Sequence, residues 1–270
     1  MTQINDTQLP LEDAPQWLAD EYEQANDGQF LEALRALEKT DLYKKNIAGL
    51  AADIGCGSGR LAAELAHRGW SVDATDVSKS MISKTIERCN GLPVNANVCD
   101  AKQLVLKPNI YDLVTSFWML HWLKDATHTL EQMAAAVKPG GCIAIQWSCS
   151  QPNTEGFLLR DTLQEVFTSP KWQGRLKGAP LAMFQHSLED VSAFFLHKGF
   201  EVVSIRENIN VAGGENPESL KKALRAAAFA AQTVVLGDDV DQFIDECLAL
   251  LFSRNAMNVA NSELIVRLKY

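Results

Sequence analysis

The chain has 270 residues, with 25 Lys and Arg against 34 Asp and Glu, and therefore a formal net charge of -9. This length allows one large α/β domain or two small ones, and ordinary shares of apolar (47%) and charged (22%) residues exclude a mainly disordered chain. The acidic balance argues against a general nucleic-acid-binding protein, whose binding surface would be basic, but leaves room for a local basic pocket.

No targeting or membrane-spanning segment is expected. No stretch approaches the roughly 20 apolar residues that span a bilayer, and the N-terminus MTQINDTQLPLEDAPQW has neither the basic start nor the apolar run of a signal peptide. The six cysteines are scattered, without Cys-x-x-Cys pairs or nearby paired histidines, so we expect no metal site and no disulfide framework. We therefore expect a cytoplasmic protein with free thiols, and neither a membrane nor a nucleic acid as its partner; the sequence favours no oligomeric state.

From the N-terminus, a helix over 15–39 is followed by alternating strands and helices. Strands are expected at 47–54, 71–75, 94–98, 111–117 and 142–146. Helices are expected at 60–68, at 80–89 after the cap candidate Ser78, and at 127–137 before Pro139-Gly140-Gly141. Alternation of this kind predicts parallel strand pairing in a doubly wound α/β sheet with helices on both faces.

The last 120 residues follow a different pattern. Short helical pieces are expected over 151–190, helices over 217–234 and 240–254, and strands over 200–211 and 263–268. We interpret the two strands as the last of the same sheet, interrupted by insertions that cover a ligand. The predicted organisation is an N-terminal helical cap (1–46), a ligand-binding core (47–150) and a covering region with the last two strands (151–270).

The sharpest motif is the glycine loop, residues 53–59, which reads Asp-Ile-Gly-Cys-Gly-Ser-Gly between a strand and a helix. Glycines let the backbone turn tightly and approach a ligand, and the helix N-terminus offers free N–H groups. The dinucleotide fingerprint G-x-G-x-x-G fails because Arg60 stands at its last position, and the phosphate loop fails because no Gly-Lys-Ser/Thr follows.

Acidic residues follow the next two strands. Asp76 ends the second strand, where a carboxylate can accept hydrogen bonds from both hydroxyls of a ribose; Asp73 on the same strand is the weaker candidate. Asp100 follows the third strand, where it can accept from an adenine amine. An isolated aspartate at a strand end is more often a turn cap, but the order of glycine loop, Asp76 and Asp100 favours ligand binding.

At this point residues 47–146 resemble class I S-adenosylmethionine-dependent methyltransferases. The resemblance rests on the glycine loop, on Asp76-Val77-Ser78 with Met81, on Cys99-Asp100-Ala101, on residues 111–114 and on residues 130–141. It implies a Rossmann-like seven-stranded sheet with an antiparallel last strand, and S-adenosylmethionine as cofactor. It also implies a set of cofactor-binding residues: Asp53, Gly55, Cys56, Gly57, Gly59, Asp76, Val77, Met81, Asp100, Ala101 and Ser116.

The acceptor side is expected at residues 116–122, where the fourth strand ends. The segment Leu120-His121-Trp122 resembles small-molecule carboxyl methyltransferases that act on trans-aconitate, malonyl-carrier protein or juvenile hormone acid. Because some of those proteins have Gln at the position of His121, a hydrogen-bond donor is the more economical catalytic role than a general base. His121 and Trp122 are the predicted catalytic residues, and Trp118 and Trp147 are predicted to bind the substrate. Trp122 and Trp147 are expected as apolar walls, with core packing as the alternative.

A carboxylate acceptor would need local positive charge in this acidic protein. Arginine offers a planar bidentate fork, so Arg160, Arg175 and Arg225 are the preferred substrate-binding candidates, although a solvated face explains any one of them. The sequence thus predicts methyl transfer to a small-molecule or carrier-bound acceptor, preferably a carboxylate. The alternatives are methylation of a hydroxyl or amine of a secondary metabolite with His121 as base, and a non-catalytic cofactor-binding protein.

Overall fold

The computed structural model describes residues 17–43, 48–152, 154, 156–179, 181–211, 217–257 and 259–269. The start of the predicted N-terminal cap (1–16), residues 44–47, where the first strand was expected to begin, and the loop residue Pro180 lie outside the described residues. Within the described part, no helix is both long and apolar enough to cross a membrane.

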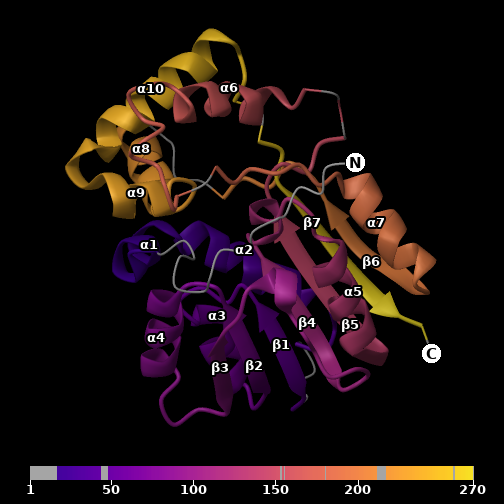
Figure 1. The fold of residues 1–270 in the computed structure, drawn as a ribbon. Helices are drawn as coiled ribbons and strands as arrows, with labels where there is room; N and C mark the ends of the chain where they lie inside the picture. Colours follow the sequence, from indigo (N-terminus) through magenta and orange to yellow (C-terminus); the bar gives the residue numbers. More distant parts are fainter. Residues whose placement is uncertain are drawn as a thin grey trace, which may run out of the picture.

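One seven-stranded sheet forms the centre of the molecule, in the order β3-β2-β1-β4-β5-β7-β6 (Figure 1). The first five strands pair in parallel, and β7 is antiparallel to both of its neighbours. The strands are β1 (Leu50–Ile54), β2 (Ser71–Asp76), β3 (Val94–Val98), β4 (Tyr111–Phe117), β5 (Val137–Trp147), β6 (Phe200–Arg206) and β7 (Ser262–Leu268). The predicted sheet is confirmed, and its parallel strands place their carboxyl ends along one edge.

Helices cover both faces of the sheet because alternate strand residues are apolar on each side. One face packs against α2, α3 and α4, and the other against α5 and α7. These helices are α2 (Asp27–Glu38), α3 (Arg60–His67), α4 (Lys79–Arg88), α5 (Thr127–Ala136) and α7 (Leu188–His197), and the short helix α1 (Ala19–Ala25) precedes α2. The Ser78 side chain accepts from the backbone N–H of Met81, so the predicted N-cap of α4 is confirmed.

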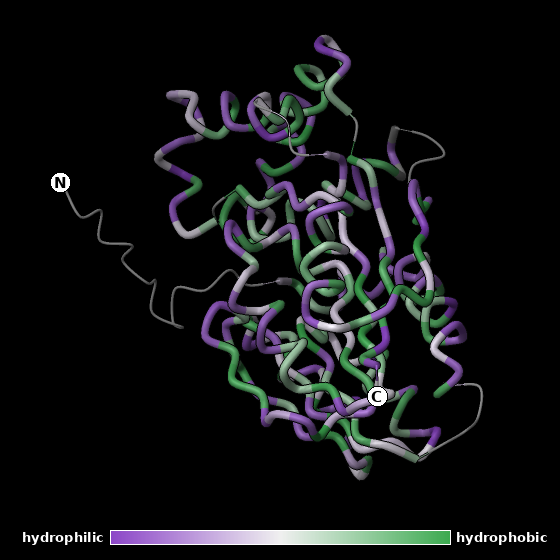
Figure 2. The backbone as a smooth tube through the Cα atoms, turned by 90° about the vertical axis from the view of Figure 1, so that its right-hand side faces the viewer, coloured by the Kyte–Doolittle hydropathy of each residue, from purple (hydrophilic) through white to green (hydrophobic). Residues whose placement is uncertain are grey.

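Four further helices, named here the helical cover, lie together away from the sheet (Figure 1). They are α6 (Leu158–Phe167), α8 (Pro217–Ala226), α9 (Ala230–Leu236) and α10 (Val240–Ser253). The cover has its own apolar core, in which the rings of Phe167, Trp172 and Phe229 each pack against the ring of Phe243 with centroids 5.1–5.4 Å apart. Hydrophobic residues (green) are frequent in the centre of the molecule and recur among hydrophilic ones along the helices of the cover (Figure 2).

Four predicted elements differ from the structure in detail, and one of them is the strand expected over 200–211, which ends at Arg206. The helix expected over 15–39 is divided at Asn26 into α1 and α2, and the helix expected over 217–234 is divided into α8 and α9. Strand β5 begins at Val137 rather than Cys142, because the pairing with β4 shifts between Tyr111 and Leu113 and residues 138–141 form a bulge. A bulge tolerates Pro139, which the pairing of a central strand would not.

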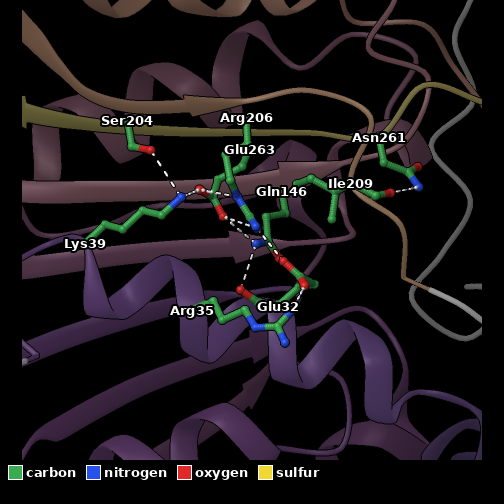
Figure 3. A network of polar contacts seen from close by, with 9 residues as sticks. All are labelled: Glu32, Arg35, Lys39, Gln146, Ser204, Arg206, Ile209, Asn261 and Glu263. Atoms are coloured by element: carbon green, nitrogen blue, oxygen red, sulfur yellow. Dashed lines mark hydrogen bonds and ion pairs between the residues drawn. The ribbon is translucent and has the colours of Figure 1, made fainter.

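A buried polar network joins α2 to the antiparallel strands (Figure 3). The fully buried carboxylate of Glu263 accepts from Lys39 at 2.8 Å, from Gln146 at 2.8 Å and from Arg206 at 3.0 Å. Arg206 also pairs with Glu32 of α2, and the Gln146 side-chain amide donates to the Glu32 backbone carbonyl at 3.0 Å. A buried carboxylate is tolerated only when its partners are in place, so this network fixes α2 against the sheet.

Candidate functional site

The main cavity, about 1000 Å³ including the space open to solvent, lies over the carboxyl ends of β1, β2, β3 and β4. Open α/β sheets bind ligands at this edge, where the strand order reverses on either side of β1. Of the residues predicted to bind the cofactor, seven line this cavity: Gly55, Gly57, Asp76, Val77, Met81, Asp100 and Ala101. Strand ends therefore bring together residues that lie up to 46 positions apart in the chain.

The glycine loop has the left-handed backbone that glycine permits. Gly55, Gly57 and Gly59 have φ angles of +74°, +54° and +77°. A Cβ atom at Gly55 would lie 2.6 Å from the Met119 side chain, and one at Gly59 would lie 2.6 Å from Thr85. Gly57 instead has open space before Tyr22, at 3.6 Å. Gly57 therefore faces the cavity, whereas Gly59 allows close packing of α3 and α4 and does not line the cavity.

Asp76 and Asp100 both line the cavity at neighbouring strand ends. The Asp76 carboxylate accepts from the backbone N–H of Gly57 at 3.0 Å and of Ser78 at 2.9 Å, so it also fixes the glycine loop. Burial raises the pKa of Asp76, and these two N–H donors oppose that rise. Asp100 accepts from the Lys102 backbone N–H at 3.0 Å, which is the turn-cap role given above as the alternative, and it also lines the cavity.

Beyond β4 the chain turns sharply to present aromatic side chains. Trp118 has a φ of +62°, which is rare for a bulky residue, and its backbone N–H donates to the Gln146 carbonyl at 2.6 Å. This turn places Trp118, His121 and Trp122 on the cavity wall. Trp122 packs edge-to-face against Trp17, with ring centroids 5.1 Å apart.

His121 is held in one tautomer by the backbone. The Ser148 N–H donates to His121 Nδ1 at 3.2 Å, so the neutral ring carries its proton on Nε2. Burial, with a smaller contribution from nearby His186, lowers the pKa of His121 from 6.5 to about 3. At neutral pH His121 is therefore a hydrogen-bond donor, and its buried ring is a poor general base.

A second cavity, about 480 Å³, adjoins the first behind the glycine loop. It is lined by Asn26 and Gln29 of the N-terminal helices, by Asp53, and by Arg60 at the start of α3. Three polar atoms of these residues are buried without a hydrogen-bond partner among the described residues: Asn26 Nδ2, Gln29 Oε1 and Asp53 Oδ2. Burial raises the pKa of Asp53 to about 7, although the Thr115 hydroxyl donates to its other oxygen at 2.8 Å.

These donors and acceptors suit a zwitterion. Arg60 supplies a positive charge and Asn26 Nδ2 a donor, both complementary to a carboxylate, while Asp53 and Gln29 supply oxygen acceptors for an ammonium group. The Arg60 guanidinium also pairs with Asp27 at 2.8 Å and lies 4.2 Å from the centroid of the Phe30 ring. The second cavity therefore fits the α-amino-acid end of S-adenosylmethionine, and the main cavity fits its adenosine.

Several predicted site residues lie elsewhere. Trp147 is fully buried in the core beneath α7, where its indole N–H donates to the His186 carbonyl at 2.8 Å, so it packs as core and forms no cavity wall. Ser116 is fully buried on β4 and lines neither cavity. Cys56 lines only the second cavity. Because side chains alternate along β5, Ser148 rather than Trp147 reaches the main cavity.

The three predicted substrate arginines do not line either cavity. Arg160 stacks on Phe184 at 4.3 Å and donates to the Leu181 carbonyl at 3.3 Å. Arg175 pairs with Asp239 at 2.6 Å, and Arg225 pairs with Asp241 at 3.1 Å and Glu21 at 3.5 Å. These residues bind partners within the cover or between the cover and α1, so they form no clamp for an acceptor carboxylate.

Some cavity residues were not predicted as site residues. They come from the N-terminal helices, from the turn after β4, from the segment before α7 and from the turn between α8 and α9, and include Tyr22, Gln29, Met119, Met183, Ala227 and Ala228. Arg60 was noted only as the residue that breaks the dinucleotide fingerprint. A cation in the first turn of a helix, where acidic residues are usual, is the signal that could have identified it.

Comparison with known proteins supports the assignment of the core. Residues 51–141 match the family described as methyltransferase domain. The chain is 32% identical over 102 residues to the ubiquinone/menaquinone biosynthesis C-methyltransferase UbiE of Desulfotalea psychrophila, which covers 36% of this chain and 41% of that protein. It is 33% identical over 93 residues to the mouse mitochondrial arginine-hydroxylase NDUFAF5, covering 34% of this chain and 26% of that protein.

A putative sarcosine dimethylglycine methyltransferase from Galdieria sulphuraria has a similar structure, with a TM-score of 0.64 and 16% identity over 90% of this chain and 85% of that one. The fold is therefore the Rossmann-like fold of class I methyltransferases. The family match supports S-adenosylmethionine as the cofactor. The sequence matches span less than half the length of the curated relatives, and they do not distinguish a carboxyl methyltransferase from other kinds.

Proposed function

We propose that this protein is an S-adenosylmethionine-dependent methyltransferase that methylates an oxygen atom of a small-molecule or carrier-bound acceptor. The observation that carries the proposal is the pair of adjoining cavities, bounded by the glycine loop, Asp76 and His121. In class I methyltransferase folds, such a loop and strand-end carboxylate are expected to hold the cofactor. When bound, the cofactor supplies an electrophilic methyl group on a sulfonium.

Each part of the site has a separate task in this proposal. Asp76 accepts from the ribose hydroxyls, and Met81 and Ala101 pack against the adenine beside Asp100. Arg60 and Asn26 bind the carboxylate of the cofactor, and Asp53 and Gln29 bind its ammonium group. Catalysis then depends on alignment and on exclusion of water, because a methyl sulfonium needs little further activation.

The acceptor atom is best supplied as a carboxylate oxygen. In this proposal His121 donates to it from Nε2–H, because Nδ1 accepts from Ser148, and the lowered pKa of His121 makes its ring a poor base. A carboxylate oxygen forms the new C–O bond with its own lone pair as the carbon–sulfur bond breaks and that electron pair stays on sulfur. No proton has to leave, whereas a hydroxyl or ammonium acceptor would need a base.

Calorimetric titration with S-adenosylhomocysteine tests this proposal. Asp76→Ala should weaken binding about a hundredfold, since about 2.7 kcal/mol corresponds to two hydrogen bonds to a carboxylate. Asp73→Ala is the matched control, because Asp73 lies on the same strand, accepts from Tyr111 at 2.8 Å and lines neither cavity. Equal affinity of wild type and Asp76→Ala, or no binding to wild type, would refute the cofactor site.

A further inference from the structure

The part of the main cavity beyond β4 offers no positively charged side chain among the described residues that line it. Its wall is formed mainly by apolar side chains: Trp17, Trp122, Leu123, Met183, Ala227 and Ala228. The polar residues there are His121, which is neutral, and Ser148. Residues 1–16, which precede Trp17 in the chain, contain no Lys or Arg.

The cations nearest to this wall do not line it: Lys124 follows the wall residue Leu123 but is exposed, and Arg160 stacks on Phe184 beside Met183. Arg225 of α8 precedes the two alanines of the wall, but it is paired with Asp241 and Glu21. Arg60 lines the second cavity, on the side of the glycine loop, where the proposed function assigns it to the carboxylate of the cofactor. A second negative charge on an acceptor would therefore lie against apolar groups without a partner, which is strongly unfavourable.

One negative charge can be accommodated. The acceptor carboxylate would face the positive sulfonium of the cofactor and the Nε2–H of His121. With the carboxylate balanced in this way, the remaining wall favours an uncharged remainder of the acceptor molecule. The edge-to-face pair of Trp17 and Trp122, with an interplanar angle of 72°, offers both a ring face and a ring edge for aromatic packing.

We propose that the acceptor is a monocarboxylic acid with an apolar, preferably ring-containing body, and that this wall selects it against di- and tricarboxylic acids. This inference rests on the proposed function, because it assumes that the cofactor occupies the glycine-loop side of the cavity. Trp17 and Trp122 are then the specificity-determining residues. The wall selects against a second carboxylate because it has no cation to pair with it, and no arginine is needed to bind the first carboxylate.

The test titrates phenylacetate and 1,4-phenylenediacetate into the protein loaded with sinefungin, whose ammonium group replaces the sulfonium. Phenylacetate should bind at least a hundredfold more tightly, and with S-adenosylmethionine it should yield the methyl ester by mass spectrometry. Equal or tighter binding of the diacid, no binding of phenylacetate at 20 mM, or faster methylation of 2-phenylethanol would each overturn the inference. Failure of S-adenosylhomocysteine to bind would instead refute the proposed function.

A charge-adding variant gives an independent readout. Ala228 is partly buried and lines the apolar wall, so Ala228→Arg places a cation where the wall has none. The association constant of the diacid divided by that of the monoacid should rise at least tenfold in this variant. Ala228→Leu is the control for side-chain size and should leave the ratio unchanged. An unchanged ratio in Ala228→Arg, with S-adenosylhomocysteine binding intact, would contradict the missing-partner argument.

Discussion

The side of the sheet proposed to bind the cofactor, called here the cofactor side, and the helical cover are built in different ways. On the cofactor side, backbone geometry and strand register position the important groups: left-handed glycines, and aspartates at the ends of β1, β2 and β3. In the cover, side-chain packing around Phe243 positions the helices, and the half-buried Arg225 and the nearby exposed Arg175 pair with neighbouring acids. The first construction tolerates little change of sequence, whereas the second can accept new wall residues without altering the cofactor site.

The two sides meet at the main cavity. Residues from the strand ends line its cofactor part, while Ala227 and Ala228 of the cover line its far wall. The N-terminal helices lie between them and contribute Trp17, Tyr22 and Gln29. Because the Glu263 network ties α2 to the sheet, the cofactor half includes α2 (Figure 3). Whether the cofactor side and the cover are independent can be tested by destabilising one of them at a time.

The largest expected effect is on the stability of the cover. Trp172 is fully buried there, and its indole N–H donates to Glu246 at 2.6 Å. Trp172→Ala should lower the free energy of unfolding of the cover by about 3–5 kcal/mol, the usual cost of truncating a buried large aromatic residue. Affinity for S-adenosylhomocysteine should change less than threefold.

Trp70→Ala is the matched comparison, since Trp70 is equally buried in the core between the sheet and α3. It should destabilise the cofactor half and weaken S-adenosylhomocysteine binding with it. Chemical denaturation measures the stability of each variant, and calorimetric titration with S-adenosylhomocysteine measures its affinity for the cofactor product. If both of them lose cofactor affinity equally, the two halves are one cooperative unit and the comparison fails.

The next effect concerns the second cavity. Arg60→Ala should weaken binding of S-adenosylhomocysteine about tenfold to thirtyfold, because a charged hydrogen bond contributes about 1.5–2 kcal/mol. Binding of 5′-methylthioadenosine, which lacks the amino-acid group, should change less than twofold. A parallel loss for both ligands in calorimetry would mean that Arg60 acts by supporting the fold rather than by binding a carboxylate.

Replacement of Asp53 should stabilise the fold at high pH and weaken the binding of S-adenosylhomocysteine. Because burial raises its pKa to about 7, the folded protein binds more protons than the unfolded chain between about pH 4 and 7. Proton binding by Asp53 therefore stabilises the folded state at low pH, and this stabilisation is lost as the pH rises from about 4 through 7. Asp53→Asn should raise the free energy of unfolding at pH 8 by about 1–2 kcal/mol and weaken S-adenosylhomocysteine binding. Denaturation curves of wild type and Asp53→Asn should differ more at pH 8 than at pH 5. The same difference at both pH values would contradict the raised pKa of Asp53.

His121 should give the smallest effect. His121→Gln keeps a side-chain N–H donor, so we expect kcat/KM within tenfold of wild type, about 1.4 kcal/mol, and a flat profile between pH 6 and 9. Its lowered pKa also predicts that wild type loses stability as the pH falls from 6.5 towards 3, where the unfolded chain binds the extra proton. His121→Gln should lose less over that range. A thousandfold loss of activity would instead identify His121 as a base.

Sequence patterns predicted what depends on local geometry. The glycine loop, the carboxylate of Asp76 and the cap at Ser78 follow from residue types next to strand ends, and the structure places Gly57 and Asp76 on the cavity wall as expected. The central strands β1, β4 and β5 could be predicted because their residues are mainly apolar and buried. Their boundaries were less certain where tertiary pairing decides, as at the bulge before Cys142.

Long-range packing could not be predicted in this way. The partners of Arg175 and Arg225 are acids of the cover and of α1, which are 64, 16 and 204 positions distant. Trp147 and Ser148 are neighbours in sequence, and only the orientation of β5 determines that the indole enters the core. Gln29 reaches the site because α2 is anchored by residues on three strands far along the chain, Gln146, Arg206 and Glu263.

The most direct test of the central claim is a crystal structure of the complex with S-adenosylhomocysteine. The account predicts both ribose hydroxyls within hydrogen-bond distance of Asp76, the amino-acid group in the second cavity beside Asp53 and Arg60, and the sulfur directed towards the wall of His121, Trp17 and Trp122. A ligand whose ribose lies away from Asp76, or whose sulfur is separated from that wall by the adenine, would contradict the account.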